Sequence, residues 1–378
     1  MLQPNMKWGT VNDATGENKV FQILEVPENP NSTDTMPHFP FGGTGYNSEA
    51  VRLLMLRVSH YHLYKTILVQ LGVSKLIHAG FKHTEFGHEE FGRQFVVSGP
   101  PGIGKSVMLN LIWYVALFEF GMDVICHMPR NDIDLYRNGS GTVERLDENG
   151  AKVMLLKWNT VYLFDSDEKG ELSPIYSLMN KATNVITTSP KISHNCVNLV
   201  KHDCMPKDIC VIPLWSYAWS YNEIITGLNT LGFTEVRSIS KAVQGSFRYA
   251  LKAVTDPVAF HDAILKDNLT SVISLVTKTK LKIPSKEVIV DMITTGTLQC
   301  QPFHSIETQQ APEFEKNVSL TILGYLKDLK TEPVQELPEL INVLKNAKEP
   351  KTVKAFAKGQ QTARQYHSYF SLKKEWQS

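Results

Sequence analysis

The sequence predicts an α/β fold whose centre is a doubly wound, mostly parallel β-sheet, with a helical lid and small N- and C-terminal elements. Between residues 95 and 214, short apolar runs alternate with helical segments, which is the pattern of a parallel sheet. One run, Phe95-Val96-Val97, leads into a glycine-rich loop and then into an apolar helix at 106–120. Another run ends in Asp165. Both runs would end at the same edge of the sheet, where open α/β folds bind ligands.

The glycine-rich loop matches G-x-x-x-x-G-K-[ST], the phosphate-binding P-loop. Its glycines let backbone N–H groups approach an anion without interference from Cβ atoms, and the helix N-terminus adds a positive dipole end. We expect Lys105 to reach the β- and γ-phosphates of a nucleotide and Ser106 to ligate Mg²⁺. The strand and helix around the loop favour this interpretation over a turn with no ligand. The predicted nucleotide-binding residues are Gly99, Pro100, Pro101, Gly102, Ile103, Gly104, Lys105 and Ser106.

The run Val161 to Phe164 ends in a carboxylate, which is the Walker B pattern. Such a strand presents Asp165 at the carboxyl edge of the sheet, where it would hold Mg²⁺ directly or through water. Asp167 and Glu168 follow, and either is a candidate to orient the attacking water. A strand ending in an ordinary acidic turn is the alternative. A P-loop roughly sixty residues upstream favours the metal-binding role.

Three further groups of residues are candidates with open alternatives. The strand at 184–189 ends in hydroxyl residues, which either sense a γ-phosphate or form a turn. Arg248 follows Gly245-Ser246, where its guanidinium would face phosphate oxygens or form a surface ion pair. A zinc site is one interpretation of the histidines and cysteines between 194 and 210, but their spacing fits no standard zinc pair, so we expect loop residues and a partly buried thiol there.

Composition excludes several classes of protein. The chain has 378 residues, 42% of them hydrophobic, and a formal net charge of +1, which is typical of a globular protein and gives no sign of general polyanion binding. Five cysteines without regular spacing favour a reduced compartment. The first twenty residues hold no apolar signal-peptide core, and the apolar run 109–120 is too short to span a bilayer. We therefore expect a soluble intracellular protein without a membrane partner.

The chain divides into four predicted regions. Strands at 7–10 and 19–26 would pair, one or more helices would cover 48–71, and a hairpin would join 142–145 to 152–158 across Asn149-Gly150. Helices are expected at 221–231 and at 235–254, with a break at the glycine of the second. The regions are a β element and connector at 1–47, the α/β core at 48–215, a helical lid at 216–282 and an α-rich C-terminal region at 283–378.

Six segments together resemble the P-loop NTPase module of Crinkler effectors and the related retrotransposon hot spot proteins. The resemblance covers roughly residues 48–282. Arg237 and Arg248 match positions where the family tends to place arginine. The segments are LMLRVSHYHLYKTIL (54–68), FVVSGPPGIGKS (95–106), WNTVYLFDSDE (158–168), VITTSP (185–190), VIPLWSYAWSYNEI (211–224) and VRSISKAVQGSFRYAL (236–251).

The resemblance implies an effector that acts inside a host cell, often in its nucleus, through a host protein target or by self-association. Family members often carry an N-terminal delivery domain and end in a nuclease-like domain. The resemblance thus implies a secreted effector, but this sequence shows no such leader and stops where a nuclease module would start, so secretion and DNA cleavage are left open. No carboxylate–lysine nuclease cluster occurs after residue 283, and nucleic acid as a partner is left open.

The predicted activity is Mg²⁺-dependent hydrolysis of ATP or GTP. Lys105 and Mg²⁺ would neutralise charge on the phosphoryl group, Asp165 would fix the metal, and Asp167 or Glu168 would orient the water. Arg248 would supply a further positive charge. The alternative is a nucleotide-gated interaction module with little or no hydrolysis.

Overall fold

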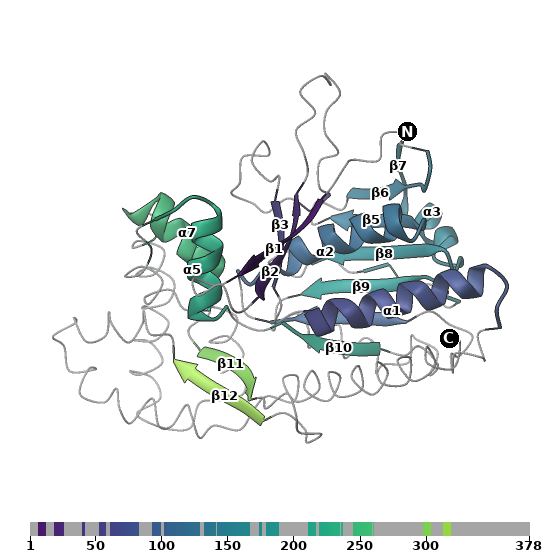
Figure 1. The fold of residues 1–378 in the computed structure, drawn as a ribbon. Coiled ribbons are helices and arrows are strands. Elements are labelled where there is room, and N and C mark those ends of the chain that lie inside the picture. Colours follow the sequence, from purple (N-terminus) through teal and green to yellow (C-terminus); the bar gives the residue numbers. More distant parts are fainter. Residues whose placement is uncertain are drawn as a thin grey trace, which may run out of the picture.

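The fold was examined in a computed structural model, whose two larger sheets and covering helices are drawn in Figure 1. The structure describes residues 7–12, 19–25, 40–41, 53–57, 61–82, 93–99, 102–128, 132–140, 142–166, 174–175, 179–188, 211–216, 219–234, 236, 245–258, 260, 298–303 and 313–318.

A seven-stranded sheet forms the centre of the molecule, in the order β10-β4-β9-β8-β5-β6-β7. The first five strands of that order run parallel, and β6 and β7 continue the sheet antiparallel. The prediction of a mixed α/β protein with a mostly parallel sheet is therefore confirmed. The strands are β4 (Gln94–Ser98), β5 (Asp123–Met128), β6 (Asp132–Tyr136), β7 (Val143–Arg145), β8 (Thr160–Asp165), β9 (Thr183–Thr188) and β10 (Val211–Trp215).

Burial explains why these runs form strands. Every residue of β4 and of β9 is buried, as expected for strands in the middle of a parallel sheet. β10 lies at the edge of the sheet, which is where a strand tolerates Pro213 and its missing N–H.

Helices α1 (Tyr61–His78) and α2 (Lys105–Tyr114) cover one face of the sheet. Their buried side chains share a hydrophobic core with alternate residues of the strands, including Phe95, Val97 and Leu163. A π-helical turn, η3 (Val115–Glu119), extends α2, and the chain then leaves through Gly121 at φ 66°. Glycine is the residue that most often follows a helix in this left-handed conformation. A doubly wound sheet carries helices on both of its faces. Because α1 and α2 pack on the same face, this part of the predicted fold stays a prediction.

A separate antiparallel sheet is formed by β1 (Lys7–Asn12), β2 (Lys19–Glu25) and β3 (Leu53–Arg57), in that order. The predicted pairing of the first two strands is confirmed. The helix predicted over 48–71 is wrong for β3, because the residues of that strand pair with β2. A short apolar run does not by itself distinguish strand from helix, and tertiary pairing decides. The helix instead begins at Tyr61 and continues to His78.

The predicted hairpin across Asn149-Gly150 is also wrong. These residues lie in the first turn of α3 (Glu148–Met154), because Asp147 caps that helix by accepting a hydrogen bond from the Gly150 N–H at 2.7 Å. The actual hairpin joins β6 to β7.

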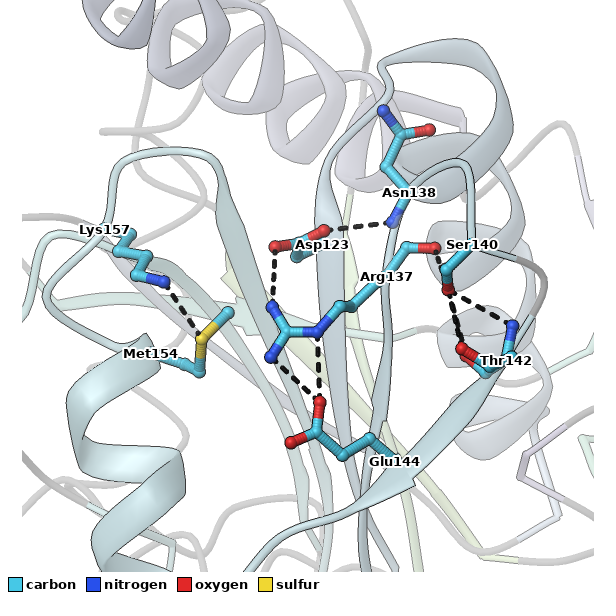
Figure 2. Close-up of polar contacts among 8 residues, drawn as sticks. All are labelled: Asp123, Arg137, Asn138, Ser140, Thr142, Glu144, Met154 and Lys157. Carbon is cyan, nitrogen blue, oxygen red and sulfur yellow. Dashed lines mark hydrogen bonds and ion pairs between the residues drawn. The ribbon is translucent and has the colours of Figure 1, made fainter.

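The β6–β7 turn is tied to Asp123, the first residue of β5 (Figure 2). The Arg137 guanidinium donates to Glu144 at 2.8 Å and lies 3.9 Å from Asp123, which also accepts from the Asn138 N–H at 2.9 Å. These partly exposed ion pairs contribute little stability individually and act mainly to define the turn.

Two helices and the N-terminal sheet enclose a second hydrophobic core. Its helices are α5 (Tyr221–Thr230) and α7 (Phe247–Thr255), and the first was predicted. The predicted break at Gly245-Ser246 is confirmed, since Ser246 is the N-cap of α7, while 237–244 lie outside the described residues. The members of this second core are Phe21, Ile103, Trp219, Ile224, Leu228, Val236, Ala250, Leu251, Ala253 and Phe260.

A strand pair was not expected in the C-terminal region. There β11 (Leu298–Phe303) pairs antiparallel with β12 (Glu313–Val318). The rest of the predicted α-rich region lies outside the described residues, and the four region boundaries stay predictions. Among the helices of the described ranges, none has the length and apolar character needed to cross a membrane.

We expect Asn110→Leu to lower the free energy of unfolding by about 2–3 kcal/mol. The buried Asn110 amide accepts from the Phe41 N–H at 2.9 Å and donates to the Phe41 carbonyl at 2.7 Å, so the substitution leaves both backbone groups without these bonds. Urea unfolding measures the loss. The control Val107→Ala, on the exposed side of the same helix, should stay within about 0.5 kcal/mol of wild type. Equal losses in the two variants would contradict this role of Asn110.

Candidate functional site

The candidate site is the loop between β4 and α2, at the carboxyl end of the parallel strands. Its glycines take backbone conformations or close approaches that other residues avoid. At Gly99, a Cβ atom would lie 2.4 Å from the Ser216 carbonyl oxygen. At Gly102, with φ 71°, a Cβ would lie 2.3 Å from the Ser246 Oγ. Gly104 is the left-handed N-cap of α2 at φ 92°. The loop is therefore enclosed by β10 on one side and by the start of α7 on the other.

Lys105 begins α2, and its ammonium group is turned back into the loop. Its Nζ donates to the Gly99 carbonyl at 2.9 Å. Burial lowers the pKa of Lys105 to about 8, with Arg248 acting in the same direction and the Asp165 carboxylate opposing both. The site therefore holds a desolvated cation whose charge Asp165 compensates only in part.

Asp165 ends β8 next to this lysine. Its Oδ1 accepts from the Thr187 hydroxyl at 2.5 Å, and Thr187 is its register partner on β9. Burial raises the pKa of Asp165, while hydrogen bonds from Thr187 and Ser106 and the charges of Lys105 and Arg248 act to lower it. The carboxylate is thus within hydrogen-bonding reach of the helix that carries Ser106.

Arg248 reaches the site from the second core. It is the second residue of α7, and its backbone N–H donates to the Gly102 carbonyl at 3.4 Å. Its guanidinium charge is felt by both Lys105 and Asp165. Of the two interpretations made from the sequence, a role near the loop fits this placement better than a remote surface ion pair.

The sequence did not indicate two residues that hold the loop. The indole Nε1 of Trp219 donates to the Ile103 carbonyl at 3.2 Å, and the Ser216 N–H donates to the Ser98 carbonyl at 2.7 Å. Both follow β10, whose pairing with β4 brings them beside the loop between β4 and α2. No spacing motif marks them, because the contact depends on strand order and not on local sequence.

The structure thus brings together Lys105, Ser106, Asp165 and Arg248 around the glycines of the loop. Pro100, Pro101, Asp167, Glu168 and Arg237 lie outside the described residues, as do the histidines and cysteines between 194 and 210. In the described part of the chain there is no group of three or more His, Cys, Asp or Glu side chains placed to hold a metal ion.

Compared with known proteins, the chain matches no family model and no curated protein at a significant level. The chemistry of the loop therefore has to be inferred from its own residues.

We expect Gly102→Ala to destabilise the protein by about 1–3 kcal/mol more than Gly104→Ala. Both glycines have positive φ, so both alanines meet similar backbone strain, but only at Gly102 would the new Cβ collide with Ser246 and Arg248, since nothing lies within 4 Å at Gly104. Chemical denaturation of the two variants measures the difference. Equal destabilisation of the two variants would show that α7 does not contact the loop closely at Gly102.

The wild-type protein should gain stability relative to Lys105→Met as the pH rises from about 7.5 to 9.5, by about 1–2 kcal/mol. The folded pKa of Lys105 is about 8, below its ordinary value of 10.5. Above pH 8 the unfolded state therefore keeps a proton that the folded state has released, and linkage makes unfolding less favourable. Urea unfolding at several pH values tests this. A pH-independent difference between the two proteins would contradict the lowered pKa of Lys105.

Proposed function

We propose that this protein binds a nucleoside triphosphate, ATP or GTP, together with Mg²⁺ and hydrolyses it. The observation that carries the proposal is the meeting of Lys105, Ser106 and Asp165 around a glycine loop at the carboxyl end of β4 and β8. Carboxyl ends of parallel strands are where open α/β sheets bind ligands.

The charge state of the loop supports an anionic ligand. Burial and the charge of Arg248 lower the pKa of Lys105, and the Asp165 carboxylate opposes this change. A polyphosphate would add the negative charge that stabilises both cations. The N-terminus of α2, with its left-handed Gly104 cap, offers backbone N–H groups to the same ligand.

The residues present also fit a magnesium ion. Ser106 and Asp165 offer hard oxygen ligands, already joined by a hydrogen bond, and Thr187 holds the carboxylate in place from β9. Bound with the nucleotide, Mg²⁺ would neutralise charge on the β- and γ-phosphates. Mg²⁺ usually takes only one or two protein carboxylates together with substrate phosphates, so this small ligand set suits it.

The remaining residues would act on the reacting phosphate. Lys105 would donate to its oxygens, and Arg248 would add positive charge from α7. Asp167 and Glu168 follow β8 directly and are the proposed candidates to orient the attacking water. The resemblance to Crinkler and retrotransposon hot spot NTPase modules leads to the same proposal, with an effector that acts on a host protein or by self-association.

A second candidate is a nucleotide-gated interaction module with slow or no hydrolysis. It is favoured by the contacts that join the loop to the second core, through Trp219 to Ile103 and through Arg248 to Gly102. A ligand in the loop would thereby bias the position of α5, α7 and the N-terminal sheet.

We expect purified protein to release phosphate from ATP or GTP in the presence of Mg²⁺ and not in EDTA. Lys105→Ala and Asp165→Ala should each reduce the rate by about 10²–10³, because each removes charge stabilisation at the phosphates. Lys152→Ala is a matched control, since this exposed lysine pairs with Glu148 on α3 and should leave the rate within about twofold.

Binding of Mg²⁺-ATP without turnover, lost in Lys105→Ala, would favour the gated module over the enzyme. Neither binding nor turnover would refute both functions.

A further inference from the structure

Trp219 joins the second core to the loop between β4 and α2, as the Arg248 backbone also does. Its ring stacks on Phe247 of α7, with centroids 4.4 Å apart and planes 21° apart, and tilts against Phe21 of β2 at 5.6 Å. The Arg57 guanidinium of β3 lies over the ring, 4.8 Å from its centroid. Side chains from three separate elements therefore fix the indole, which is only 4% exposed.

A buried ion pair holds the cation over this ring. The Arg57 Nε lies 3.4 Å from Glu223 Oε1, and Glu223 Oε2 also accepts from the Ser220 N–H at 2.7 Å, in the capping box of α5. Burial lowers the pKa of Arg57 to about 10, and Glu223 opposes that change. The N-terminal sheet is thereby attached to α5 directly beside Trp219.

The polar edge of the indole is directed at the loop. Nε1 donates to the Ile103 carbonyl at 3.2 Å, and one residue earlier the Gly102 carbonyl accepts from the Arg248 N–H at 3.4 Å. Two successive carbonyls of the loop therefore face the second core.

Peptide geometry then decides where the neighbouring N–H groups face. No peptide bond in the described ranges is cis, and in a planar trans peptide the C=O and the following N–H are directed oppositely. The carbonyl of Ile103 shares its peptide with the N–H of Gly104, and the carbonyl of Gly102 shares its peptide with the N–H of Ile103. Both N–H groups are therefore turned away from the second core.

We propose that Trp219 is a positioning residue for phosphate binding: its indole N–H holds the Ile103–Gly104 peptide so that the Gly104 N–H is presented to a bound phosphate. The inference rests on the proposed nucleotide binding. A peptide next to glycine reorients easily, so without this bond the loop would sample orientations that present a carbonyl to the anion. Pre-organising the donor raises affinity by removing that cost from binding.

The test replaces the indole N–H without changing the shape of the ring. In 3-benzothienylalanine a sulfur atom occupies the place of the N–H, so a protein carrying it at position 219 keeps the stacking on Phe247 but loses the hydrogen bond. Trp219→Phe is the simpler companion variant. Trp113→Phe, in the main core beside Tyr136, is the matched control for loss of a buried tryptophan.

Calorimetric titration with Mg²⁺-ADP should show Kd about fivefold to tenfold weaker for the isosteric protein, the magnitude of one hydrogen bond. Its melting temperature without nucleotide should stay close to that of wild type. Trp113→Phe should lower the melting temperature and leave Kd within about twofold. This separation of affinity from stability would not arise from a structural role alone.

Two results would overturn the inference, and only the second would also refute the proposed function. If wild-type protein binds Mg²⁺-ADP and the isosteric protein binds it equally well, Trp219 does not position the loop, although nucleotide binding stands. If wild-type protein shows no Mg²⁺-ADP binding, both the proposed function and the inference fail.

Discussion

The loop between β4 and α2 is confined between two hydrophobic cores, and the rest of the site depends on that confinement. On one side Gly99 lies against the backbone that follows β10, and on the other Gly102 lies against Ser246 at the start of α7. Only glycine fits at either position, because a Cβ would approach within 2.4 Å or 2.3 Å of an oxygen atom. The loop is therefore held by contacts that are far apart in sequence.

Buried or partly buried charges occur in two places, and the two groups have different partners. Arg57 is paired with Glu223 and covered by Trp219, so its desolvation is offset within the protein. Lys105 is opposed by Arg248 and supported by Asp165, whose own charge is disfavoured by burial. The first pair joins structural elements. The second set is electrostatically incomplete, which is the condition under which an anionic ligand with its metal ion stabilises a site.

Local sequence was enough to predict the loop, the strand before it and Asp165. The glycine-lysine-serine spacing sets the backbone locally, and buried β-branched runs form strands without help from distant residues. The helix predicted for Leu53–Arg57 is wrong, because this segment becomes a strand only through its pairing with β2, which is distant in sequence. The turn predicted at Asn149-Gly150 is wrong, because Asp147 caps a helix that includes both residues. The contact of Trp219 with Ile103 depends on strand order, which no local pattern contains.

Hydrogen–deuterium exchange with and without Mg²⁺-ADP is the most direct test of the proposal that the loop between β4 and α2 binds phosphate. The account predicts slower exchange at the amides of 102–106, and also at the start of α7 and around Trp219, because these segments share hydrogen bonds with the loop. Unchanged exchange at 102–106 when nucleotide is present would contradict it.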